Sequence, residues 1–285
     1  HQPSSDAFRK TVMAPTTALH STTAQQLRES AKIARQFGIR MHSHLSETVD
    51  YLDAARAKFG MTPVQFCAEQ DWVGSDVWFA HLVKLLPEEI QLLGQTQTGI
   101  AHCPQSNARL GSGIADLVSL EQAGMTISIG VDGAGSNEAA DMLSETHAAW
   151  LLQRARKGMS ALPQYEGGLF EGGADAASIE DIIRWGTLGG AKILGLDQVG
   201  SIEVGQQADL VAYQLDDPRY FGLHDMAIGP VASGGRAHIK AMFVAGKMVV
   251  ENDQIPDVDM MELAWQAKQS VKLLQQRSVE MAKIA

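Results

Sequence analysis

The stretch Met41-His42-Ser43-His44-Leu45-Ser46-Glu47-Thr48 places an imidazole and a carboxylate three residues apart, directly after a short apolar run. The preceding residues Phe37–Met41 are typical of a helix that stops at Gly38 and is followed by a buried strand. A side chain at the end of such a strand is held by the sheet behind it. His44 can therefore bind a metal, while Glu47 in the loop acts on the molecule that the metal activates.

Three later segments repeat this pattern of a short apolar run that ends in an ionisable residue and a turn. Their ionisable residues are His81, His102 and Asp132. The successive intervals from His44 to His81, from His81 to His102 and from His102 to Asp132 each fit one strand–helix unit. In a (β/α)8 barrel, functional groups collect at the C-terminal ends of the strands, so the four residues indicate one site on such a scaffold. The segments are Phe79–Leu82, Ile100–Asn107 and Ile127–Gly133.

These motifs resemble the amidohydrolase superfamily. The closest likeness is to its metal-dependent deaminases of cytosine, isocytosine, 8-oxoguanine and S-adenosylhomocysteine, together with the s-triazine hydrolases. The wording HSHLSET with HCPQSN is most similar to the isocytosine and 8-oxoguanine deaminases. The matching segments are His44–Glu47 at the family's fifth strand, His81 at the sixth, Ala101–Asn107 at the seventh, Gly130–Gly133 at the eighth, and Val199–Leu210 at the entry to its small β-sandwich.

The fold class that follows is α/β. Only five strand-like runs can be counted, whereas a closed barrel needs eight. The runs are Thr11–Thr16, Ile39–Leu45, Val77–Leu82, Gly99–Pro104 and Thr126–Asp132. The family's first strand carries a His-x-His, but the one His-x-His here, His42-Ser43-His44, matches the fifth strand. We therefore expect the C-terminal part of a longer protein: strands 4–8 of a (β/α)8 TIM-type barrel, part of a small β-sandwich and a C-terminal helix. The expected domains are a partial metal-dependent hydrolase barrel at 1–198, a sandwich segment at 199–252 and a helical segment at 253–285.

The resemblance also implies a cofactor and roles for the site residues. We expect one divalent metal, preferably Zn²⁺, held by His44, Asp132 and two further histidines on a His-x-His outside this chain. A second metal is not expected, because Thr11–Thr16 offers no bridging lysine. The expected catalytic residues are Glu47, His81 and Asp132. Asp132 takes a proton from the water, His81 hydrogen-bonds the metal-bound hydroxide, and Glu47 protonates the ring nitrogen and then the departing ammonia.

Three functions agree with these residues. The first is a zinc-dependent hydrolytic deaminase of a small nitrogen heterocycle, such as an isocytosine-like or 8-oxoguanine-like base. The second is an s-triazine chloro- or alkylamino-hydrolase on the same scaffold, and the third is a catalytically silent scaffold protein. Structural roles also stay open for individual residues: packing for His42 and His102, and a buried thiol for Cys103. The sequence does not identify the substrate-binding residues.

Composition limits the class of partner. The 285-residue chain has a net charge of −10, which argues against binding to polyanionic nucleic acid. No apolar run approaches the roughly 20 residues of a membrane helix. Two cysteines, Cys67 and Cys103, form no disulfide framework, so we expect a cytoplasmic protein. We expect a small heterocycle as partner, and a homo-oligomer.

Local signals predict the remaining elements. Thr22 or Thr23 should cap a helix that runs to Phe37, and Ser178 should cap one that ends near Gly195. Prolines at the first turn predict two more helix starts. The other predicted segments are helix starts at Pro63 and Pro87, a helix over Glu138–Lys157, a loop over Tyr165–Asp175, strands within Asp209–Tyr213 and Lys240–Val250, and a helix over Met260–Ala285.

Overall fold

The computed structural model describes residues 10–161 and 176–282, so the predicted loop Tyr165–Asp175 lies outside the described residues. The chain divides into two units. The larger unit comprises His1–Gln207 and Leu215–Ala237, and the smaller one comprises Ala208–Gln214 and His238–Ala285. The domain limits proposed from the sequence stay predictions.

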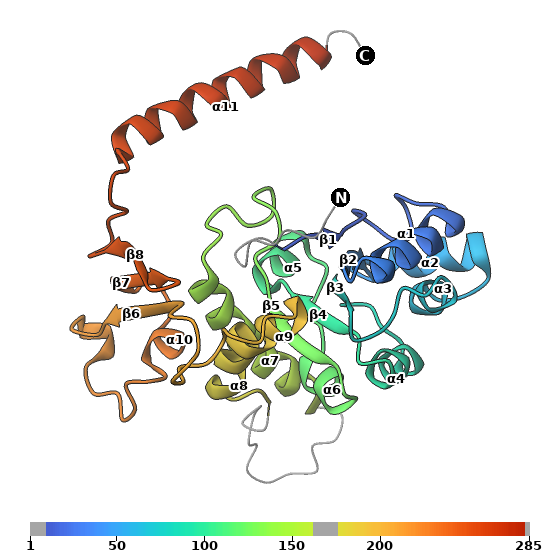
Figure 1. Ribbon diagram of the computed structural model, residues 1–285, viewed down its shortest axis with the longest axis horizontal. Coiled ribbons are helices and arrows are strands. Elements are labelled where there is room, and N and C mark those ends of the chain that lie inside the picture. The colour runs from blue at the N-terminus through green and yellow to red at the C-terminus, as the bar shows by residue number, and fades with distance from the viewer. Residues whose placement is uncertain (1–9, 162–175, 283–285) are drawn as a thin grey trace. The chain divides into compact units, whose positions relative to one another are not determined.

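Five parallel strands form the sheet of the larger unit, in the order β1-β2-β3-β4-β5 (Figure 1). Each lies within one of the five runs predicted from the sequence, which confirms the α/β class and the parallel arrangement. The first strand is shorter than its run Thr11–Thr16, because Pro15 has no N–H to donate to a ladder. The strands are β1 Val12–Met13, β2 Arg40–Leu45, β3 Val77–His81, β4 Gly99–His102 and β5 Thr126–Ile129.

Side chains alternate along β2, and this alternation sets the direction of the site residues. Met41, Ser43 and Leu45 are fully buried, while His42 and His44 share the opposite, partly accessible face. Every residue of β3 is buried, as expected for a central parallel strand. The sheet therefore carries the imidazole of His44 on a rigid support.

Helices follow the strands, and most begin where the sequence predicts. Thr23 caps α1 through a capping box with Gln26, and Thr62 and Ser178 form the same motif at the starts of α3 and α8. Helix α7 begins at Met142 rather than near Glu138. The helices of the larger unit are α1 Ala24–Gln36, α2 Val49–Phe59, α3 Pro63–Glu69, α4 Pro87–Gln95, α5 Pro104–Leu110, α6 Leu117–Gln122, α7 Met142–Ala161, α8 Ile179–Arg184, a π-helical turn Trp185–Gly189, α9 Gly190–Leu194, a 3-10 turn Pro218–Tyr220 and α10 Gly229–Ser233.

The later start of α7 has a local cause. The turn Gly133–Asn137 is closed by Ser136 N and Asn137 N, which both donate to Gly133 O. Asp141 then accepts the backbone N–H of Leu143 with its side chain, at 3.0 Å, as a capping residue does. The helix cannot begin before this cap, so the loop after β5 keeps its own conformation.

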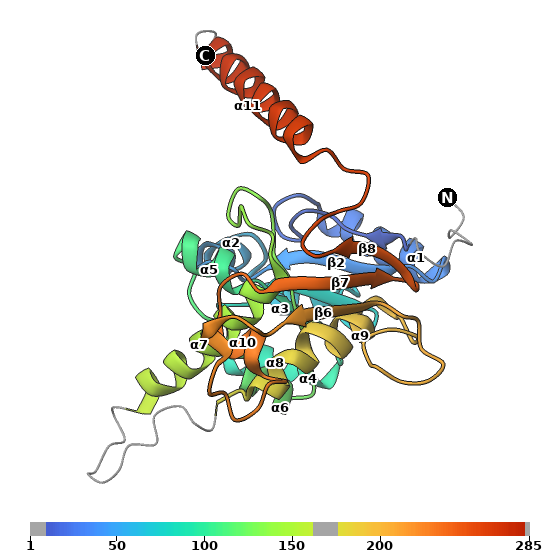
Figure 2. The same ribbon diagram turned by 90° about the vertical axis from the view of Figure 1, so that its left-hand side faces the viewer.

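The smaller unit contains a three-stranded antiparallel sheet in the order β6-β7-β8, seen side by side in Figure 2. The segment Lys240–Val250 holds parts of two strands, because Ala245 and Gly246 both have positive φ and form a two-residue hairpin turn. Among the described residues, none of the helices combines the length and apolar character that crossing a membrane requires. The elements of this unit are β6 Leu210–Gln214, β7 His238–Val244, β8 Lys247–Glu251 and α11 Met260–Ala282.

Candidate metal and catalytic site

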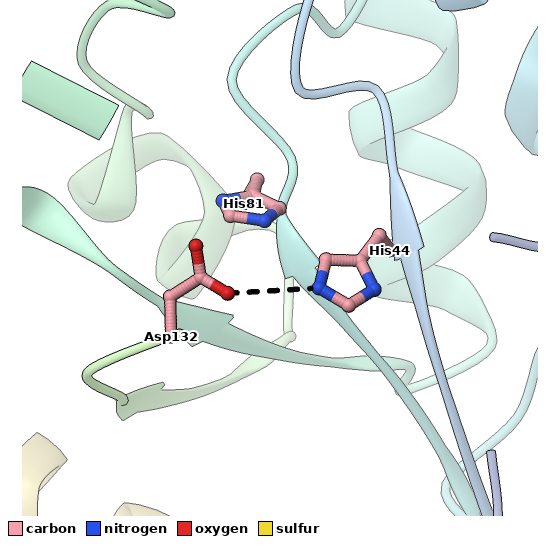
Figure 3. A group of neighbouring side chains, drawn as sticks. All are labelled: His44, His81 and Asp132. Atoms are coloured by element: carbon pink, nitrogen blue, oxygen red, sulfur yellow. Dashed lines mark ion pairs between the residues drawn. The ribbon is translucent and has the colours of Figure 1, made fainter. Parts of the chain in front are cut away.

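Three of the predicted residues meet at the C-terminal edge of the parallel sheet. His44 is the penultimate residue of β2, His81 ends β3 and Asp132 follows β5. One donor atom from each lies within 4.8 Å of the others, and Figure 3 shows the three side chains facing one another. His44 Nε2 is 3.7 Å from Asp132 Oδ1. The structure therefore brings together residues that are 88 positions apart along the chain, from His44 to Asp132.

Both imidazoles direct Nε2 into this cluster. His44 Nδ1 lies 2.5 Å from Thr16 O, and His81 Nδ1 lies 2.8 Å from Asn107 Oδ1. A carbonyl or amide oxygen only accepts, so each Nδ1 carries the proton and donates it. Each Nε2 then presents a lone pair. Metal-binding histidines are commonly fixed in this way, with the distal N–H donated to an oxygen.

Asp132 is held as an anion. Its Oδ2 accepts hydrogen bonds from Ser106 Oγ at 2.6 Å and from Ser136 Oγ at 3.0 Å, which leaves Oδ1 toward His44. Burial alone would raise the pKa of Asp132, but these hydrogen bonds and the one from the Gly133 backbone outweigh it. The pKa consequently lies below its usual range.

Glu47 lies beside the three residues but not among them. Its Oε2 is 3.7 Å from His81 Nε2, and its Oε1 accepts a hydrogen bond from Ser112 Oγ at 3.1 Å. Its side chain is 17% exposed, so solvent or a small molecule can reach it. This geometry suits a group that exchanges protons next to a metal site.

The remaining predicted candidates have separate surroundings. The ring of His42 stacks on Trp78 at 5.0 Å, and burial followed by the neighbouring His44 lowers the pKa of His42 to about 4. His102 is fully buried, and neither ring nitrogen has a hydrogen-bond partner among the described residues. Burial lowers the pKa of His102 to about 3. Cys103 is a buried thiol whose pKa burial raises. His42 and His102 are neutral at physiological pH.

Several supporting residues carried no assigned role in the sequence analysis. Ser106, Asn107 and Ser112 each hydrogen-bond a predicted site residue, and Glu145 of α7 accepts from Asn137 Nδ2 and from Gln105 N at 3.2 Å. The pKa of Glu145 is raised by its burial. One signal in the sequence could have found them. Where a helix begins directly after a strand, small polar residues in its first turns face the functional end of that strand.

The donor set fits zinc. Two imidazole nitrogens and a carboxylate oxygen are ordinary zinc ligands, and the 3.7 Å between His44 Nε2 and Asp132 Oδ1 allows both to reach one ion at ~2.0–2.2 Å. The fixed Nδ1–H tautomers leave the lone pairs that a cation needs.

Comparison with known proteins agrees with this site. The model of the amidohydrolase family matches residues 1–249. An isoxanthopterin deaminase from an unknown prokaryotic organism is 60% identical over 96% of this chain and 57% of its own length. An 8-oxoguanine deaminase from Pseudomonas aeruginosa is 38% identical over 79% of this chain and 46% of its own length.

Solved structures agree as well. The crystal structure of an adenosine deaminase from Xanthomonas campestris with bound zinc is 28% identical. It superposes with a TM-score of 0.84 over 93% of this chain and 57% of that protein. The chain thus spans about half the length of the relatives that it matches. Family model, relatives and fold together show that the chain belongs to the amidohydrolase family.

Proposed function

We propose that this chain carries the catalytic residues of a zinc-dependent hydrolytic deaminase that acts on an isoxanthopterin-like or 8-oxoguanine-like heterocycle. The observation that carries the proposal is the meeting of His44, His81, Asp132 and Glu47 at one edge of the parallel sheet. The relatives at 60% and 38% identity support the substrate class. Isoxanthopterin and 8-oxoguanine share an isocytosine ring, which is the ring expected from the sequence.

We also propose that β1 to β5 are strands 4–8 of a (β/α)8 barrel. Their parallel order and the helices between them support this. A site at the C-terminal strand edge is where such barrels place their chemistry. The buried free thiols Cys67 and Cys103 support a cytoplasmic location, and a homo-oligomer remains a prediction.

His44 and Asp132 would hold the zinc ion, with His81 beside it. A zinc ion bound here would supply a nucleophile at neutral pH, because zinc lowers the pKa of a bound water from ~15.7 to about 7. Asp132 would bind the ion with Oδ1, the oxygen that its serine partners leave open, and accept the proton of the attacking water with its other carboxylate oxygen. His81 accepts a hydrogen bond at Nε2 and holds the water against the ring.

Glu47 completes the proton transfers. It protonates the ring nitrogen next to the amino-bearing carbon, which makes that carbon electrophilic. After water adds, a proton passes to the amino group, the C–N bond breaks, and ammonia leaves while a carbonyl forms. General acid–base help of this kind contributes roughly 10²–10⁴-fold per group. The net reaction converts the ring amine and one water molecule to a ring carbonyl and ammonia.

A product assay on the full-length protein tests the proposal. Ammonia release is measured from isoxanthopterin, 8-oxoguanine and isocytosine, with zinc-loaded and chelator-treated enzyme. The expected result is release that depends on zinc and is highest with one of the two bicyclic substrates. Chloride or alkylamine released from a triazine would favour the second function, and no product from any substrate would favour the silent scaffold.

A further inference from the structure

We propose that the segment Ser106–Ser112 positions the site: its three buried polar residues Ser106, Asn107 and Ser112 each hold one of the functional side chains Asp132, His81 and Glu47. The inference rests on the proposed function for those three roles. The segment covers the end of α5 and the turn after it, and none of its three positioning residues is placed in contact with the reacting atoms. The three site residues come from three other strands or loops.

Each of the three contacts is within hydrogen-bond distance and is made by a buried positioning residue. Ser106 Oγ lies 2.6 Å from Asp132 Oδ2, Asn107 Oδ1 lies 2.8 Å from His81 Nδ1, and Ser112 Oγ lies 3.1 Å from Glu47 Oε1. Ser106 and Asn107 are fully buried and Ser112 is 3% exposed. Hydrogen bonds to charged groups in such surroundings are stronger than neutral ones on the surface.

Each contact selects one orientation. Ser106 makes the shorter of the two hydrogen bonds to Oδ2, the other coming from Ser136, and so helps to turn Oδ1 of Asp132 toward His44. Asn107 fixes the proton of His81 on Nδ1, which leaves the Nε2 lone pair in the site. Ser112 holds Oε1 of Glu47, so that Oε2 faces His81 Nε2. Without these partners, the side chains have other rotamers available.

Asn107 supplies an argument against a purely structural role. Its Nδ2 is buried and has no hydrogen-bond partner among the described residues. An unsatisfied buried donor destabilises a fold. An apolar side chain of similar size would avoid that penalty, so the value of Asn107 lies in its Oδ1 contact with His81.

The segment is also locked by its own backbone. Ser112 N donates to Asn107 O at 2.9 Å, and Gly111 between them has a φ of +72°, a conformation that glycine adopts without strain. This turn fixes the spacing of Asn107 and Ser112. The end of α5 and the turn after it therefore fix the positions of the His81 and Glu47 side chains relative to each other.

The test compares single variants in the full-length zinc-loaded protein. Ser106→Ala should weaken zinc affinity about 10-fold or more, because Asp132 is a proposed ligand. Ser112→Ala should keep the zinc and KM near wild type and lower kcat roughly 10-fold or more, because Glu47 is not a ligand. The hydroxyl-retaining variants Ser106→Thr and Ser112→Thr should restore part of each loss.

Asn107→Leu is tested by a signal that needs no turnover. The ¹⁵N NMR shifts of the imidazoles report which nitrogen of His81 carries the proton. The expected result is loss of the exclusive Nδ1–H form in Asn107→Leu. The matched control is Ser128→Ala, which removes a buried hydroxyl that donates only to Ile100 O, at 2.8 Å, in the same sheet. It should change stability alone.

The outcomes separate the two proposals. If wild type releases no ammonia, the proposed function fails, while the zinc affinity of Ser106→Ala and the His81 tautomer in Asn107→Leu still decide the positioning role. If wild type is active and the three variants behave like Ser128→Ala, the positioning role is wrong. Equal falls of zinc content, kcat and melting temperature in all three variants would also overturn it, because they indicate lost packing only.

Discussion

Replacing Glu47 with glutamine removes a titrating proton with little change of shape. The amide oxygen can still accept from Ser112 Oγ, and the amide N–H can point toward the Nε2 lone pair of His81. Both contacts of the carboxylate therefore keep a partner. We expect the free energy of unfolding to change by less than about 1 kcal/mol, the net value of one ordinary hydrogen bond.

The effect on turnover should be much larger. Glu47 is proposed to move two protons, and general acid–base groups contribute roughly 10²–10⁴-fold. A loss of about 10²-fold in kcat corresponds to about 2.7 kcal/mol in the activation free energy. Zinc content should remain that of wild type, because Glu47 lies beside the three clustered donors and is not one of them.

The assay combines ammonia release with zinc measured by elemental analysis on the same preparation. Glu89→Gln is the matched control, since Glu89 is a buried glutamate outside the site that accepts only backbone N–H groups, from Val64 and Leu86. It should lower stability and leave kcat alone. Loss of zinc from Glu47→Gln would make Glu47 a ligand and refute the mechanism, and full activity would assign the proton transfers to another residue.

Three further results are expected. His44→Ala should lose most of its zinc and its activity, and elemental analysis should show no recovery after dialysis against micromolar zinc. Below pH 6.5 the unfolded state protonates His102 while the native state, with a pKa of about 3, does not, so the free energy of unfolding falls by up to about 1.4 kcal/mol per pH unit toward pH 3. In His102→Leu, the free energy of unfolding measured by urea titration should fall less steeply with decreasing pH. The same dependence on pH as in wild type would contradict this. Gly189→Ala should destabilise by ~1–3 kcal/mol or more, because a Cβ would lie 1.9 Å from Ile127 O, whereas Gly190→Ala meets nothing within 4 Å and should be neutral or stabilising in thermal melts.

The strands and the main site residues could be predicted because both follow from short patterns. Each strand is an apolar run ended by a turn, and parallel strands bring their C-terminal ends to one edge. His44, His81 and Asp132 were therefore placed together from their positions alone, and the structure has their donor atoms within 4.8 Å. Glu47, three residues after His44, followed from the same edge.

The supporting contacts could not be predicted, because they depend on side-chain directions across the fold. The hydrogen bond between Ser112 and Glu47 joins residues 65 positions apart, and serine occurs at surfaces and turns in any sequence. The ring of His102, which has no hydrogen-bond partner in the described part of the chain, could not be foreseen either, since the sequence leaves open which side of its strand faces the core. Such details require the packed structure.

The backbone at the strand ends connects stability with function. Ser46, His81, Leu82 and Asp132 all have φ between +44° and +74°, the left-handed region that non-glycine residues seldom adopt. Residues held in such conformations cost of order 1–3 kcal/mol each, and they persist where the surrounding structure fixes them. Here the abrupt turns at the ends of β2, β3 and β5 end the ladder and direct functional side chains across the sheet edge. Glycine at position 81 or 132 would relieve the strain and remove the chemistry, so the buried core of the larger unit must offset this cost for the site to exist.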